Sequence, residues 1–161
     1  GVVVPQGVLT GSSNAHKAIK KSLLENNTLE AVIDLPSGVF NPYSGVSTSI
    51  VVFKNGGSTK SVWFYKVNAD GFTLNANRNP INDNDLPDLI ARFPNREEGD
   101  NSINVDAKTI IDNDYSLNVN NYLIRETEEI EYAHPRELLG EIKGIENQIL
   151  EQIKVLEEDI K

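Results

Sequence analysis

Residues 32–53 read VIDLPSGVFNPYSGVSTSIVVF, two apolar runs typical of buried strands, joined by a loop rich in Pro, Gly, Ser, Asn and aromatic residues. Loops at strand ends often carry binding residues, so this loop is the first candidate site. Within it, Asn41-Pro42 predicts a turn, because Pro presets φ and Asn-Pro dipeptides favour turn initiation.

The flanking sequence predicts an α/β arrangement. Apolar runs that predict strands lie at residues 2–4, 29–35, 49–53 and 62–67. We interpret the run at residues 2–4 as a buried parallel strand. Residues 15–25 predict a helix after a cap-rich segment, and Asn-Gly-Gly-Ser at 55–58 predicts a hairpin that returns the chain into 62–67. This order, strand-helix-strand-strand-strand, suits the closing half of a doubly wound sheet whose last members run antiparallel.

The division we expect is an α/β part at residues 1–67, a loop-rich extension at 68–125 with a helix near 84–93, and an acidic helical tail at 126–161. The tail resembles a coiled-coil strand because its aliphatic residues recur at spacings of four and three. These predicted docking positions are Leu138, Ile142, Ile145, Ile149, Ile153, Leu156 and Ile160. The first strand would have an unpaired apolar edge, so we expect the isolated chain to self-associate.

Composition narrows the class of protein. The 161 residues include no cysteine, which excludes disulfides and thiolate metal sites, and no methionine, as expected of a piece of a longer chain. No apolar run approaches the ~20 residues that span a bilayer, and we expect a cytoplasmic protein. Residues 126–161 hold 11 acidic and four basic side chains, and the net charge of the whole chain is −9. Without a basic stripe, the chain alone should bind DNA poorly.

Several segments, in order, carry a family resemblance. They are Val2–Leu9, Leu23–Glu25, Leu29–Pro36, Gly38–Phe40, Gly45–Ile50, Asn113–Asn118 and Tyr122. Together they closely resemble the modification subunit of type I restriction systems, in the adenine-N6 DNA methylase family. The resemblance covers only the back half of that family's protein, so the expected fold is the C-terminal half of a Rossmann-like class I methyltransferase sheet.

The resemblance implies a parent enzyme that transfers a methyl group from S-adenosylmethionine to adenine N6 in DNA. Its implied partners are DNA and a specificity subunit, with the restriction subunit as a further candidate, and the tail resembles the helices that dock on the specificity subunit. The family's glycine-containing donor loop and Asn-Pro-Pro-aromatic motif are absent. We therefore expect no catalytic, cofactor-binding or metal-binding residues in this chain, and no activity from it alone.

The candidate site residues lie in the loop. In the family resembled, an aromatic residue of this loop stacks on the adenine extruded from the duplex, and Phe40 and Tyr43 occupy the matching positions. Pro36, Gly38, Thr48 and Ser49 would support the loop. The alternative for Phe40 is packing on the helix beneath it.

Other residues have structural interpretations. Asp34 ends a strand but has no companion carboxylate or histidine, so we expect it to cap the next turn or pair with a base. His16 and His134 are expected at the surface, and Trp63 within the sheet packing. The alternative function is a non-enzymatic α/β adaptor with an acidic coiled-coil arm, and a third is a methylase fused to its own specificity region.

Overall fold

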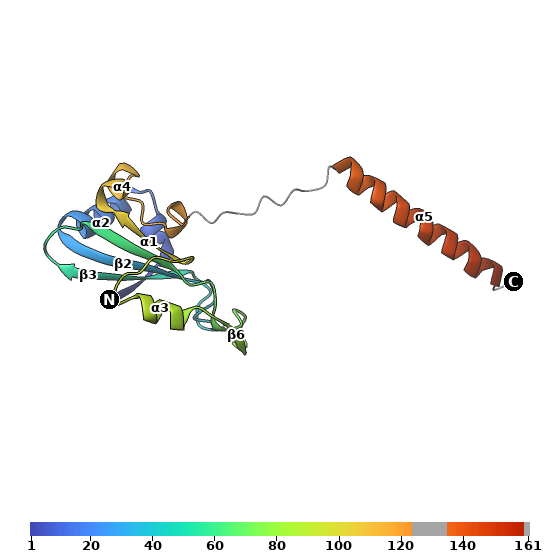
Figure 1. The fold of residues 1–161 in the computed structure, drawn as a ribbon, viewed down its shortest axis with the longest axis horizontal. Coiled ribbons are helices and arrows are strands. Elements are labelled where there is room, and N and C mark those ends of the chain that lie inside the picture. Colours follow the sequence, from blue (N-terminus) through green and yellow to red (C-terminus); the bar gives the residue numbers. More distant parts are fainter. Residues whose placement is uncertain (124–134, 160–161) are drawn as a thin grey trace. The chain divides into compact units, whose positions relative to one another are not determined.

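The structure is a computed structural model that describes residues 1–123 and 135–159. The chain divides into two compact units, residues 1–125 and 126–161. The first unit contains a five-stranded mixed sheet with helices on both faces, and the described part of the second is one helix, α5 (Pro135–Asp159) (Figure 1).

The sheet has the strand order β1-β3-β2-β4-β7. Its members are β1 (Val2–Pro5), β2 (Asn27–Leu35), β3 (Thr48–Asn55), β4 (Ser61–Lys66) and β7 (Ser102–Asp106). β3 runs antiparallel to both β1 and β2, β4 is parallel to β2, and β7 is antiparallel to β4. Consequently β1, β2 and β4 share one direction, and their carboxyl ends meet at the same edge of the sheet.

The prediction of a hairpin at residues 55–58 is wrong. Such a hairpin would pair β3 with β4, but β2 lies between these two strands. A Gly-rich turn is a local signal, whereas strand pairing depends on which apolar faces match across the sheet. β4 pairs in parallel with β2, with Ala31 opposite Trp63 and Ile33 opposite Tyr65, and all four of these side chains share one core. β4, the last of the predicted strands, is therefore parallel to its neighbour β2, whereas the sequence predicted an antiparallel strand.

β1 also differs from the predicted buried parallel strand. It pairs antiparallel with β3, and Val2 and Val3 are 47% and 53% exposed. Among the strands that the structure describes, β3 is its only partner, so one edge of β1 faces outward.

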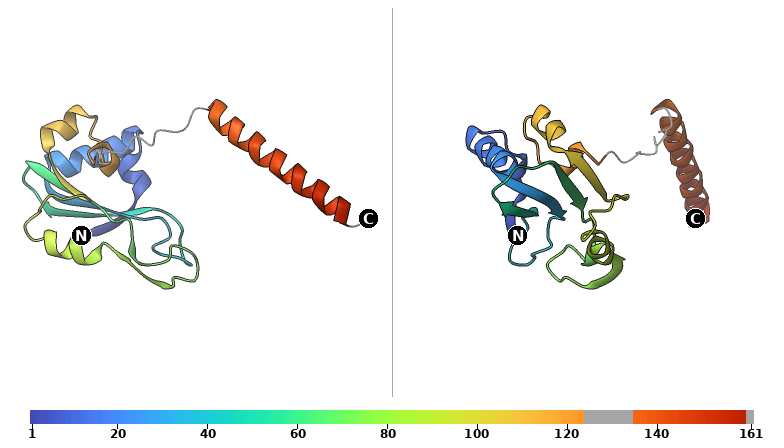
Figure 2. Two further views of the ribbon diagram at one scale, coloured as in Figure 1. Left: turned by 45° about the vertical axis from the view of Figure 1, so that its right-hand side comes forward. Right: turned by 60° about the vertical axis from the view of Figure 1, so that its left-hand side comes forward.

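Helices cover both faces of the sheet (Figure 2). α1 (Gln6–Thr10), α2 (Asn14–Glu25) and α4 (Ala107–Asp112) lie on one face, and α3 (Leu86–Arg92) lies on the other. Leu9, Leu24 and Ile110 fill the core under the first group, and Leu89 fills the second. α2 begins where the sequence predicts a cap, since Ser13 accepts a hydrogen bond from the His16 N–H.

Residues 68–125 join the same unit as the sheet. β7, α4 and the short 3-10 helix η1 (Val119–Asn121) place Val105, Ile110 and Val119 in the core beside Val32 and Phe64. β7, α4 and η1 were not predicted from the sequence, because these elements are short and polar. The remaining strands, β5 (Asp70–Phe72) and β6 (Pro80–Asn84), form a separate two-stranded hairpin.

Candidate functional site

The loop between β2 and β3, residues 36–47, folds back on itself. The Asn41 N–H donates to the carbonyl of Gly38 over 3.0 Å, and the N–H groups of Tyr43 and Ser44 donate to the carbonyl of Phe40 over 2.9 and 3.1 Å. The turn predicted at Asn41-Pro42 is confirmed, and these bonds give the segment a defined shape.

The two aromatic candidates are solvent-accessible. Tyr43 is 95% exposed and Phe40 is 41% exposed. Neither side chain belongs to either hydrophobic core. The structure therefore does not show Phe40 packed on a helix. Exposed aromatic rings on an ordered turn are available to stack on a planar ligand.

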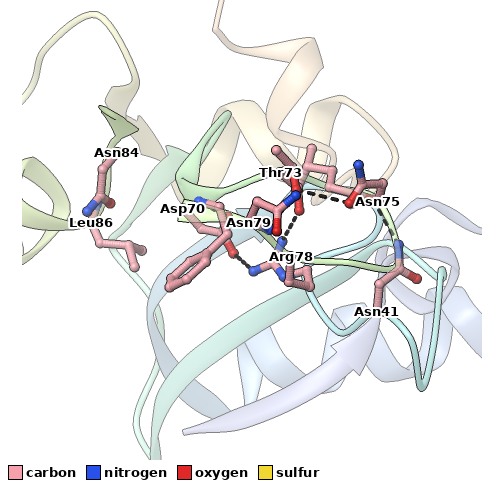
Figure 3. Close-up of polar contacts among 10 residues, drawn as sticks. Asn41, Asp70, Thr73, Asn75, Arg78, Asn79, Asn84 and Leu86 are labelled. Atoms are coloured by element: carbon pink, nitrogen blue, oxygen red, sulfur yellow. Dashed lines mark hydrogen bonds and ion pairs between the residues drawn. The ribbon is translucent and has the colours of Figure 1, made fainter. Parts of the chain in front are cut away.

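Gly38 lets the loop approach the β5–β6 hairpin closely. Its φ is +88°, and a Cβ at this position would lie 2.5 Å from the carbonyl oxygen of Leu74. The Asn41 Nδ2 donates to that same oxygen over 2.8 Å (Figure 3). At the loop's start, the carbonyl of Pro36 accepts from the Val39 N–H over 3.3 Å.

Ser49 and Asp34 join the two stems of the loop. The Ser49 hydroxyl donates to Asp34 Oδ1 over 2.6 Å, and the Gln6 amide donates to Asp34 Oδ2 over 2.7 Å. Asp34 is only 4% exposed, and this burial raises the pKa of its carboxyl, against the opposing effects of the two hydrogen bonds and the Lys66 charge. Among the residues that the structure describes, the Asp34 carboxylate therefore binds two neutral donors, and it forms neither a turn cap nor an ion pair with them.

Thr48 behaves differently from Ser49. Its hydroxyl oxygen is buried and has no hydrogen-bond partner among residues 1–123 and 135–159. Hydrogen bonding was expected of both residues, and within the described part of the chain only Ser49 does this.

A polar cavity of about 270 Å³ lies at the carboxyl ends of β1, β2 and β4. Gln6, Asp34 and Lys66 line it from these strand ends, and Asn120 lines it from η1. The Lys66 ammonium donates to Asn120 Oδ1 over 2.6 Å. Ligands of α/β proteins commonly bind at such strand ends, and this cavity can hold a small polar group by hydrogen bonding.

From the sequence, Asp34 was singled out only as a strand-end residue with an expected structural role, and Gln6, Lys66 and Asn120 were not singled out. Gln6 and Lys66 could have been found, because each stands at the end of a strand that runs with β2. Asn120 lies on a 3-10 turn and carries no comparable signal.

A larger depression, about 670 Å³, lies at the opposite edge, by the amino end of β2 and the carboxyl end of β3. Two of its cations, Lys54 and Arg96, bind the carboxylate of Glu30 over 2.7 and 3.1 Å. These paired charges lower the pKa of Glu30, chiefly through the Lys54 hydrogen bond, and so make its carboxylate a weaker base.

The remaining residues singled out by sequence have ordinary roles. His16 is partly buried and contacts the Ser13 hydroxyl over 3.0 Å, while Trp63 is 1% exposed and donates to the Glu97 carbonyl over 3.0 Å. Within the described ranges, no three His, Cys, Asp or Glu side chains are grouped to hold a metal ion. No helix there is long and apolar enough to cross a membrane. His134 lies outside the described residues.

α5 carries an exposed aliphatic stripe. Ile142, Ile145, Ile149, Ile153 and Leu156 are between 45% and 59% exposed. Five aliphatic side chains in one helical row need a covering partner. The structure does not describe the side chain of Leu138 or any part of Ile160.

S-adenosylmethionine, the methyl donor that the resemblance implies, would need the glycine-containing loop that the family carries after a strand. Nucleotide-derived cofactors of α/β proteins are commonly held at such strand-to-helix turns. β1 passes into α1 at Pro5-Gln6 without a side-chain cap, and the cavity of about 270 Å³ at this edge is lined by hydrogen-bonded side chains, among them Gln6 and Asp34. The described residues alone therefore do not fit this cofactor.

Comparison with known proteins identifies the family. A family model described as N-6 DNA Methylase matches residues 1–131. The EcoEI type I restriction enzyme methylase subunit of Escherichia coli is 35% identical over 149 residues, which cover 87% of this chain and 29% of that protein. The MpnII methylase subunit of Mycoplasma pneumoniae is 27% identical over 148 residues, covering 90% of this chain and 27% of that protein.

Solved structures agree. A chain from a structure of the type I R-M system has a TM-score of 0.63 and 27% identity, covering 97% of this chain and 34% of that one. The type I methyltransferase subunit of Streptococcus thermophilus has a TM-score of 0.59 and 28% identity, covering 73% and 25% respectively. The chain thus spans under a third of the length of the curated relatives described here. It belongs to the N-6 DNA methylase family, as its sequence match and its mixed α/β sheet both show.

Proposed function

We propose that this chain forms part of the modification subunit of a type I restriction-modification system, which methylates adenine N6 in DNA. In this proposal S-adenosylmethionine donates the methyl group and binds elsewhere in the longer protein. The loop at residues 36–47 supplies an aromatic face that stacks on the extruded adenine.

One observation carries the proposal for the loop. Tyr43, 95% exposed, stands on a hydrogen-bonded turn next to the edge where three strands end together. An extruded base needs a planar apolar face, and stacking on an aromatic residue contributes about 1–3 kcal/mol per base. Phe40, on the same turn, is the second candidate.

The test uses the full-length gene product with its partner subunits. Replacing the target adenine by 2-aminopurine reports base extrusion as a rise in fluorescence. Tyr43→Ala should weaken DNA binding about 5- to 160-fold, the range expected from loss of one stacked base. Ile90→Ala is the matched control, since Ile90 is a 71% exposed apolar residue that lies on α3 and not on the loop. Normal extrusion and methylation by both Tyr43→Ala and Phe40→Ala would contradict the stacking role.

α5 fits a docking function in the same complex. Its exposed stripe would pack on a helix of the specificity subunit as a coiled coil. The alternative adaptor function rests on this same stripe. The two functions differ in outcome, because deletion of α5 from a methylase subunit should abolish DNA modification as well as partner binding.

A further inference from the structure

The β5–β6 hairpin makes direct contact with the candidate stacking loop. Asn41, which follows Phe40, donates its side-chain N–H to the carbonyl of Leu74 over 2.8 Å. Gly38, on the other side of Phe40, brings its backbone so close to the same carbonyl that a Cβ would lie 2.5 Å away. Two residues that flank Phe40 therefore meet a single carbonyl group, Asn41 through a side-chain hydrogen bond and Gly38 through close approach of its backbone.

The segment that presents this carbonyl, residues 73–79, is itself tightly bonded. The guanidinium of Arg78 binds the carboxylate of Asp70, donates to the Thr73 carbonyl over 3.2 Å and lies 5.4 Å from the centre of the Phe72 ring (Figure 3). The Asp70 and Arg78 side chains are only 6% and 19% exposed. The Thr73 N–H donates to the Asn79 carbonyl over 2.8 Å. Through its contacts with Asp70 and Thr73, Arg78 thus links the two sides of the hairpin next to Leu74.

The hairpin is anchored to the body of the protein at its base. The Asp85 carboxylate accepts from the N–H groups of Asn68 and Ala69 over 2.7 and 3.1 Å. The Tyr65 hydroxyl, from the buried strand β4, donates to the Asp85 carbonyl over 3.3 Å. A continuous set of bonds therefore runs from the sheet through the hairpin to the loop.

We infer that Asn41 is a positioning residue, and that the β5–β6 hairpin is the brace that holds the aromatic loop in the orientation needed for base capture. The inference rests on the proposed function. Asn41 does not stack on the base. It holds the turn on which Phe40 and Tyr43 stand, so that less order has to be gained when a base binds.

The structural test uses this chain and amide hydrogen exchange. Asn41→Ala should speed exchange at the Tyr43 and Ser44 amides about three- to tenfold, the effect of losing one hydrogen bond. Asp70→Asn, which removes the charge that holds Arg78, should speed exchange at the same amides from a distance. Asn95→Ala is the matched control, because the Asn95 amide donates to the nearby Glu97 carboxylate over 3.0 Å, within the segment at 95–97 and not to the loop. Unchanged exchange in both Asn41→Ala and Asp70→Asn overturns the brace.

The functional test is a double-mutant cycle in the full-length gene product, read out as DNA affinity and 2-aminopurine fluorescence. Asn41→Ala should weaken base capture about three- to tenfold when Tyr43 and Phe40 are present. It should have no further effect once both aromatic residues are replaced by alanine. An equal effect in both backgrounds overturns the positioning role. Absence of any effect from the aromatic replacements overturns the proposed stacking role of the loop, and the exchange experiment then still decides whether the hairpin braces the loop.

Discussion

Gly38 is the residue on which the loop conformation depends most directly. Its φ of +88° and the 2.5 Å approach of a Cβ to the Leu74 oxygen both disfavour any side chain. Gly38→Ala should lower the free energy of unfolding by about 1–3 kcal/mol, since strain and a backbone clash act together. Gly45→Ala is the control, because a Cβ there meets nothing closer than 3.8 Å. Urea unfolding measures both, and equal stability of the two variants would contradict the explanation.

Asp34 should make stability depend on pH. Burial raises the pKa of its carboxyl in the folded chain above the ordinary value of 3.8, so the folded state binds the proton more tightly than the unfolded state. This contribution to stability is complete below the ordinary pKa and is lost as pH rises through the folded pKa. The free energy of unfolding of the native sequence should therefore fall relative to Asp34→Asn over that window. Urea titrations at a series of pH values measure the difference, and a constant difference would contradict the assigned pKa shift.

Among the elements, α5 carries an apolar stripe that no other described residue of its own unit covers. A charge placed on the stripe should disrupt docking, because an unpaired buried charge at an interface is costly. Ile149→Asp should abolish binding to the specificity subunit, as measured by calorimetry, while Asn147→Asp, on the opposite side of the helix, should retain it. Equal binding by both variants would contradict the proposal that the α5 stripe docks on the specificity subunit as a coiled coil.

Across the whole molecule, the outward edge of β1 is the feature that should govern association. Val2 and Val3 are about half exposed beside backbone groups with no strand partner among the described residues. Such an edge pairs readily with another chain, so the isolated 161-residue chain should self-associate. Val3→Lys should shift it toward monomer in sedimentation experiments. A native chain that is monomeric, with slow exchange of the β1 amides, would show that the edge is protected in another way.

The sequence by itself determined what depends on near neighbours and on the succession of segments. The apolar runs of β2, β3 and β4, the Ser13 cap and the Asn41-Pro42 turn were readable because each is a local preference, and the ordered segments from Val2 to Tyr122 were enough to indicate the family. Only the tertiary structure decided which strands pair. It placed β2 between β3 and β4, against the turn signal at 55–58, because matching apolar faces outweigh a local turn. It also brought together the cavity around Asp34 and the contact of Asn41 with Leu74, since these groups are 28 to 33 residues apart and no local rule relates them.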